Sequence, residues 1–231
     1  MANVQPISST QHGDIKIKAN DTLAQSKNRH FAPVVVQEFV PASQEFPVVF
    51  IKDSETGTFR SIVLLGLKPE ENLFYDNDAW QATYKPEGLT LSPFLLSQGE
   101  ESSVLCMDQD SDLVNKKSGE ALFDEQGNQT EWLTATGEKV VKYVEKTYST
   151  QNFIKMLLDN DLISSQTLNL KLENQEQYTL NGLYSIDEKK LNALSDDAFN
   201  AIRKTGALPA IYASLLSMQR IHNLARKKLA Q

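Results

Sequence analysis

The end of the chain carries the hydrophobic periodicity that most restricts the fold. After Pro209, a residue type that favours the first turn of a helix, apolar side chains recur at helical spacing. They are Ile211, Leu215, Met218, Ile221, Ala225 and Leu229. A stripe of this kind needs a surface to pack against, so the sequence predicts a packed helix over 209–229. A shorter helix is predicted before it, from Ser195 as the N-cap to Gly206 as the stop signal.

The first half of the chain shows a different pattern, in which short β-type runs alternate with turns. Residues 48–51 and 62–65 are rich in β-branched side chains, and the loop around Gly57 between them predicts a hairpin. Leucines then alternate with polar residues near 167–184, which predicts a second hairpin with one buried face. We therefore expect an α+β fold, in which a β-rich N-terminal half packs against C-terminal helices and this hairpin completes a sheet.

Two helices are predicted in the middle of the chain. The first covers 130–147, with Thr130 as its N-cap and Gly137 as a weak point. The second begins at Ser149 or Thr150 and ends near Asp159.

The predicted domain organisation is a polar N-terminal arm at 1–28, followed by a single α+β domain at 29–231. This domain divides further into a β-rich half at 29–128 and a helical half at 129–231. Within the arm, the alternation around Ile15 and Ile17 predicts an edge strand or an extended segment.

Composition narrows the classes of function. The formal net charge is −7, which argues against a nucleic-acid partner because phosphate binding depends on clustered Lys and Arg. No run of about 18 apolar residues occurs, so no membrane span is expected. The single cysteine, Cys106, cannot form an internal disulfide, and we expect a cytoplasmic location.

An acidic loop offers the spacing of a calcium site but not its complete pattern. Asp108, Asp110 and Asp112 stand at the first, third and fifth positions. The sixth position is Leu113, where the turn needs glycine, and the twelfth is Gly119, where a glutamate should bind. We expect a solvated loop and no metal, with weak divalent binding as the open alternative.

Motifs for nucleotide binding and acyl transfer are absent, and no cofactor is expected. Cys106 could act as a nucleophile if His12, His30 or His222 reached it, but its apolar neighbours favour a buried strand residue. The histidines lack metal-ligand spacing.

Two stretches are candidates for binding a ligand or a partner. One is an aromatic segment, for which the candidate residues are Asn72, Phe74, Trp80, Tyr84 and Phe94. Large rings in a turn-rich segment can line a groove, although they can equally fill the core. The other stretch is the basic end at 220–228, either a solvated helix face or a docking surface.

The segment TLNLKLENQEQYTLNGLYSIDEKKLNALSDDAFNAIRKTGALPAIYASLLSM at 167–218 resembles the carboxyl half of the SapC family. Segments that resemble the amino half are HFAPVVVQEF, EFPVVFIKD, VLLGL, NLFYDNDAW and GEALFDEQGN, in the order and spacing of that family. The resemblance runs from about His12 to the last helix. By it the chain is identified as a member of the SapC family.

This resemblance implies a role beside other proteins rather than a defined reaction. The family takes its name from assembly or export of a bacterial surface-layer protein. Its members tend to be encoded beside TonB-dependent receptors, cupin-like proteins and tryptophan-halogenase-like proteins. It implies an accessory or binding protein of a surface-layer, export or nutrient-uptake system, with a protein partner and with homo-oligomers also open. The competing hypothesis is a small enzyme or enzyme subunit that acts on a peptide or carbohydrate-related substrate.

Overall fold

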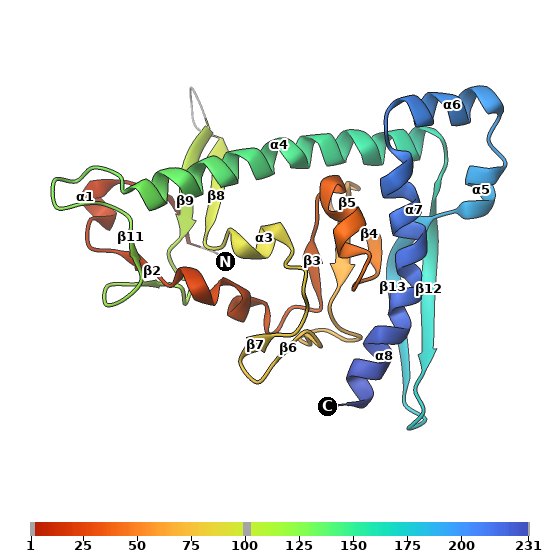
Figure 1. The fold of residues 1–231 in the computed structure, drawn as a ribbon, viewed down its shortest axis with the longest axis horizontal. Helices are drawn as coiled ribbons and strands as arrows, with labels where there is room; N and C mark the ends of the chain where they lie inside the picture. Colours follow the sequence, from red (N-terminus) through yellow and green to blue (C-terminus); the bar gives the residue numbers. More distant parts are fainter. Residues whose placement is uncertain (1–2, 99–102, 231) are drawn as a thin grey trace. The chain divides into compact units, whose positions relative to one another are not determined.

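A computed structural model describes residues 3–98 and 103–230 of the chain (Figure 1). Its internal contacts group into two compact units, each made from segments far apart in the sequence. Unit 1 comprises Met1–Ser26 and Glu87–Glu145, and unit 2 comprises Lys27–Pro86 and Lys146–Gln231. The mixture of sheets and helices confirms the predicted α+β class. The arm at 1–28 and the single domain at 29–231 stay predictions.

Unit 2 is built on a five-stranded antiparallel sheet with the order β12-β13-β4-β5-β3. The strands are β3 (Phe31–Pro33), β4 (Val48–Lys52), β5 (Phe59–Leu64), β12 (Ile163–Lys171) and β13 (Gln177–Ile186). The hairpin formed by β4 and β5 was predicted, and so was the one formed by β12 and β13. Because β13 also pairs with β4, the second hairpin completes the sheet, as expected.

Unit 2 also contains short helical elements. They are η2 (Val36–Glu38), α2 (Phe39–Ala42), α5 (Glu188–Asn192), α6 (Asp196–Lys204), α7 (Leu208–Ser217), η3 (Met218–Arg220) and α8 (Ile221–Leu229). Ser195 caps α6 as predicted, by accepting a hydrogen bond from the backbone N–H of Ala198 at 3.3 Å. Gly206 follows α6 with a φ of 77°, a left-handed conformation that glycine adopts readily and that ends the helix.

Helix α7 is fixed to the sheet by two buried serines. The Ser217 hydroxyl accepts a hydrogen bond from the backbone N–H of Val48 at 2.8 Å. The Ser214 hydroxyl donates to the Val48 carbonyl at 3.0 Å. Figure 1 shows α7 alongside β13, which it contacts, as it also contacts β4. These hydroxyls therefore satisfy backbone groups of β4 that would otherwise be buried unpaired.

The prediction of a single helix over 209–229 was wrong in one respect. The helical segment is interrupted by the 3-10 turn η3. Each residue of a 3-10 helix advances about 20° more than in an α-helix, so three residues shift the buried face by roughly 60°. Leu224 is consequently fully buried, whereas the predicted Leu229 is 37 % exposed.

The two helices predicted in the middle of the chain are one continuous helix, α4 (Glu131–Asp159). Thr130 accepts a hydrogen bond from the backbone N–H of Leu133 at 3.2 Å, which confirms the predicted N-cap. Thr150 does not start a helix. Its hydroxyl donates to the carbonyl of Lys146 and accepts from the backbone N–H of Val36. The hydroxyl that was expected to cap a new helix therefore bonds to a segment far away in the sequence.

Unit 1 contains two small antiparallel sheets, with the orders β1-β9-β8 and β10-β2-β11. The strands are β1 (Val4–Pro6), β2 (Lys16–Ile17), β8 (Phe94–Gln98), β9 (Ser103–Asp108), β10 (Val114–Asn115) and β11 (Glu120–Ala121). Helical elements are α1 (Ser9–His12), η1 (Ala19–Ser26), α3 (Glu87–Thr90) and the first part of α4. The predicted edge strand around Ile17 is wrong: β2 is central in its sheet, and Ile17 is fully buried.

Candidate functional site

The aromatic candidates are divided between the two units. Phe74 is buried in unit 2, where its ring centroid lies 4.5 Å from that of Phe46. Asn72 is also buried, and its side-chain oxygen Oδ1 accepts a hydrogen bond from the backbone N–H of Phe74 at 2.9 Å. Phe94 belongs to the core of unit 1, with its ring centroid 5.8 Å from that of Trp132. Phe94 therefore belongs to a different unit from the other four candidates.

Trp80 and Tyr84 are half-buried in unit 2, and their polar groups bond inside the fold. Trp80 lies on β7 (Ala79–Trp80), which pairs with β6 (Tyr75–Asp76). The Trp80 Nε1–H donates to the carbonyl of Tyr84 at 2.9 Å. The Tyr84 hydroxyl donates to the buried carboxylate of Glu38 at 2.8 Å, and that carboxylate also accepts from the backbone N–H of Val35. These contacts hold the aromatic segment against η2, and its role in binding stays a prediction.

A cavity of about 480 Å³ opens elsewhere in unit 2, and we call it the apolar cavity. It is lined by Val36, Gln37, Val40, Ser149, Asn152, Phe153, Met156, Thr205, Gly206, Ala207, Pro209 and Ala210. These residues come from η2, α2, the second part of α4, the turn between α6 and α7, and the start of α7. No side chain in this set titrates near neutral pH, so the cavity has no formal charge.

Part of the apolar cavity wall is accessible from outside. Phe153 is buried at 7 % exposure, whereas Val40 at the rim is 48 % exposed. The apolar surface continues along α7, where Tyr212 and Leu216 follow Pro209 on the same helix face and are 42 % and 70 % exposed. Sequence reasoning missed this site because three separate stretches of the chain, 36–40, 149–156 and 205–210, form it. The turn signals at Gly206 and Pro209 were recognised, but a turn alone does not reveal a cavity.

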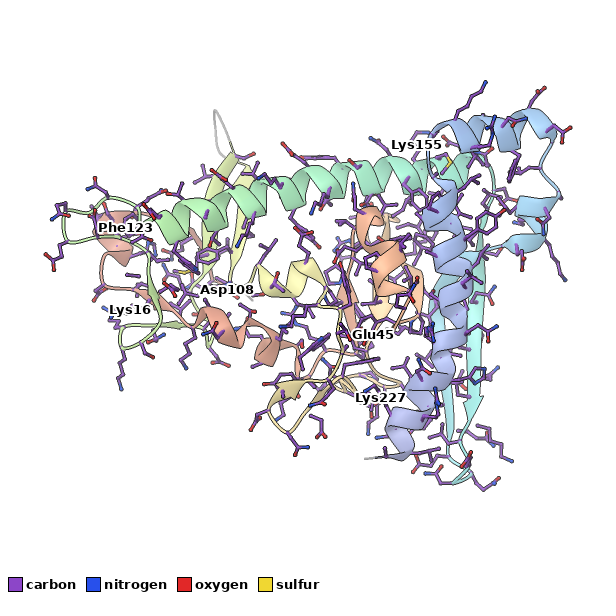
Figure 2. The ribbon with its side chains drawn as sticks, viewed as in Figure 1. Lys16, Glu45, Asp108, Phe123, Lys155 and Lys227 are labelled. Atoms are coloured by element: carbon purple, nitrogen blue, oxygen red, sulfur yellow. The ribbon has the colours of Figure 1, made fainter. Side chains whose placement is uncertain are left out.

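A second cavity of about 370 Å³ lies between α8 and the segment after α2. We call it the basic cavity, and its lining is Gln44, Glu45, Phe74, Asn223, Arg226, Lys227 and Ala230. Figure 2 labels Lys227 on α8 and Glu45, which contribute to this lining. It combines part of the predicted aromatic segment with part of the predicted basic surface.

The family assignment rests on almost the whole chain. The sequence model of the SapC family matches residues 7–224. The chain belongs to the SapC family. No curated protein and no solved structure matches it. In the described parts of this SapC-family chain, no helix is both long enough and apolar enough to cross a membrane.

The acidic loop of this SapC-family chain is organised by its own hydrogen bonds. A carboxylate oxygen of Asp108, at the end of β9, accepts from the backbone N–H groups of Asn3 at 3.1 Å and Asp110 at 3.2 Å (Figure 2). Leu113 is buried in the core of unit 1. Within residues 3–98 and 103–230, no group of three or more His, Cys, Asp or Glu side chains could hold a metal ion.

Cys106 and the histidines occupy separate environments. Cys106 is buried on β9, and its thiol lies 3.6 Å from the carbonyl of Val104. His12 is buried in unit 1, where its Nε2 lies 2.6 Å from the side-chain nitrogen of Gln109. Partial burial lowers the pKa of His30 in unit 2. His222 is exposed on α8.

Proposed function

We propose that this SapC-family protein is a non-catalytic accessory protein of a bacterial surface-layer, export or nutrient-uptake system. It acts in the cytoplasm and binds an uncharged, apolar segment of a partner protein in the apolar cavity. The observation that carries the proposal is the lining of that cavity, which has apolar walls and side-chain amides but no ionisable group. Family membership supports the setting, and the cavity supports the mode of binding.

The chemistry of the lining favours a peptide as the occupant. Val36, Phe153 and Met156 offer apolar contacts to a hydrophobic side chain. A peptide also brings backbone N–H and C=O groups, which need hydrogen-bond partners when water is removed. Gln37 and Asn152 are exposed, and each amide can both donate and accept. A charged occupant is disfavoured because nothing in the lining would compensate its lost hydration.

The same lining supports binding rather than catalysis. General acid-base catalysis needs a titratable group within hydrogen-bond reach of the reacting atoms. A serine or threonine nucleophile needs an adjacent base. The lining contains hydroxyl groups at Ser149 and Thr205, but it contains no histidine, carboxylate or amine. The lining is therefore suited to binding and releasing a peptide segment without changing it chemically.

The test uses Val40→Asp, which places a charge at the rim of the apolar cavity, and Val141→Asp as its matched control. Val141 is another helical valine, 44 % exposed against 48 % for Val40, and it is outside the lining. Heptapeptides should be selected from a random display library on the wild-type protein, and their affinities measured by fluorescence anisotropy. We expect the selection to yield uncharged, apolar peptides. Their binding should be weakened about tenfold by Val40→Asp and unchanged by Val141→Asp.

A second experiment places the site in its cellular setting. Untagged wild-type, Val40→Asp and Val141→Asp proteins are each purified from the native cells. A partner that accompanies the wild type and Val141→Asp, but not Val40→Asp, supports the proposal. Selected peptides that are mainly charged, or that bind Val40→Asp as well as wild type, would overturn it.

A further inference from the structure

Two adjacent cations of α8, Arg226 and Lys227, line the basic cavity. The next residue of the same helix, Lys228, forms an ion pair with Glu71 at 2.8 Å. In the described part of the chain, Arg226 and Lys227 have no carboxylate within ion-pair distance. The cavity lining therefore contains two cations that form no ion pair with any described residue.

The acidic residue in the same lining is already engaged. Glu45 accepts hydrogen bonds from the backbone N–H groups of Thr83 at 3.0 Å and Tyr84 at 2.8 Å, one on each carboxylate oxygen. These donors stabilise its charge in place and direct the carboxylate toward the aromatic segment. Arg226 and Lys227 remain the groups of the lining with free charge-assisted donors.

The remaining lining is suited to the body of a small molecule. The Lys227 nitrogen lies 4.8 Å from the centroid of the buried Phe74 ring, which places the ammonium over the ring face. The guanidinium of Arg226 donates to the side-chain oxygen of Asn223, one turn earlier on α8, and this bond restricts its orientation. The cavity volume of about 370 Å³ exceeds what a single oxyanion needs, since one water molecule occupies about 30 Å³.

We propose that the basic cavity binds a small molecule bearing a carboxylate or phosphate group, which Arg226 and Lys227 hold. The planar guanidinium pairs with two oxygens of such a group, and the ammonium adds a point charge. The Phe74 ring and the amides of Gln44 and Asn223 contact the rest of the ligand. This site shares no lining residue with the apolar cavity, so it stands independently of the proposed function.

The test compares Arg226→Gln with Arg203→Gln. Arg203 is an appropriate control because it is also exposed near a helix C-terminus and also donates to an asparagine three residues earlier, Asn200, at 3.1 Å. It is outside the basic cavity lining. Sodium phosphate and sodium glucuronate are titrated separately into the full chain by isothermal calorimetry, with sodium chloride at matched ionic strength as the reference. Thermal unfolding without ligand verifies that each variant is folded.

We expect saturable binding of phosphate, glucuronate or both, weakened about tenfold by Arg226→Gln and unaffected by Arg203→Gln. Lys227→Met, which keeps most of the aliphatic side chain, should weaken binding similarly. Binding of phosphate alone would assign a phosphate-bearing ligand, and binding of glucuronate alone a carboxylate-bearing ligand. The proposal is overturned if neither anion binds beyond the chloride reference, or if Arg226→Gln and Arg203→Gln weaken binding equally.

Discussion

The ammonium nitrogen of Lys228 lies 2.8 Å from a carboxylate oxygen of Glu71, and both side chains are largely buried, with 19 % and 8 % exposed. The other oxygen of Glu71 accepts a hydrogen bond from the backbone N–H of Leu67 at 2.9 Å. This pair joins α8 to the segment between β5 and β6, two parts of the chain that are far apart in sequence.

Removing one member of this pair should destabilise the protein. Lys228→Met leaves the Glu71 carboxylate buried without its cation, and we expect a loss of about 3 kcal/mol in the free energy of unfolding. The measurement is urea denaturation followed by circular dichroism. Lys155→Met is the control, because Lys155 and Asp159 form an exposed pair whose loss should cost at most about 0.5 kcal/mol. Equal effects of the two substitutions would contradict the prediction.

The same pair makes stability depend on alkaline pH. Chiefly through its hydrogen bond to Glu71, the pKa of Lys228 is raised above its ordinary value of 10.5. The folded state therefore holds this proton more tightly than the unfolded state. The stabilisation is fully present below 10.5 and is lost as the pH rises through the raised folded-state pKa. The difference in unfolding free energy between wild type and Lys228→Met should be constant around neutral pH and should shrink as the pH rises above 10.5.

The hydroxyl of Tyr84 should contribute to stability through Glu38. Tyr84→Phe removes a donor that lies 2.8 Å from a buried carboxylate, and hydrogen bonds to charged groups contribute about 1.5 to 3 kcal/mol. We expect a loss of that order in chemical denaturation. Tyr75→Phe provides the control in the same segment, because no hydrogen bond of the Tyr75 hydroxyl is formed within the described residues. A Tyr84→Phe protein as stable as Tyr75→Phe would contradict this prediction.

Trp80→Ala should act mainly on stability. The ring centroid of Trp80 lies 6.2 Å from that of Phe46 and 6.3 Å from that of Phe74, and the side chain is half-buried. Truncation should cost about 3 kcal/mol, near the lower end of the range for buried aromatic residues. Trp132 is the other tryptophan of the chain and remains as a fluorescence reporter in unit 1. Trp80→Phe, which keeps a ring but loses the hydrogen bond to Tyr84, should cost about 1 kcal/mol. An unchanged stability in Trp80→Ala would show that the ring is not a packing residue.

Calcium at millimolar concentration should leave the melting temperature of the protein nearly unchanged. Specific binding to the folded state would raise it through linkage. Gly119 occupies the position where a calcium loop has glutamate, with a φ of 115°, and a Cβ there would overlap the carbonyl oxygen of Ile17. Gly119→Glu should therefore lower stability rather than create a calcium site. A saturable calcium-dependent rise in either protein would contradict this reading.

Local signals accounted for much of the secondary structure because the atoms involved are close in sequence. Ser195 and Thr130 cap helices through backbone groups three residues away. The alternation of β-type residues produced the hairpins for the same reason. Thr150 failed as a start signal because its hydroxyl accepts from Val36, 114 residues away, while α4 continues through it. Gly137, predicted as a weak point, lies within α4, where a Cβ would stand 3.3 Å from the Leu105 side chain.

Residue types alone could propose binding surfaces, but not which side chains would be accessible there. Phe74 and Phe94 look alike in sequence, yet the fold buries them in different units. Likewise, Lys227 and Lys228 are neighbours with the same chemistry. Helical geometry turns them about 100° apart, so Lys228 meets Glu71 while Lys227 lies over Phe74 at the basic cavity.

Backbone propensity, capping groups and hydrophobic periodicity specified the α+β class, the hairpins and most helices, since these depend on interactions within a few residues. The membership of each unit, the break at η3 and the two cavities depended on contacts between distant segments. Ser217 illustrates the difference: its hydroxyl pairs with Val48 across 169 positions. No local pattern encodes such a pairing, because the partner becomes available only when the sheet and α7 have packed together and excluded water.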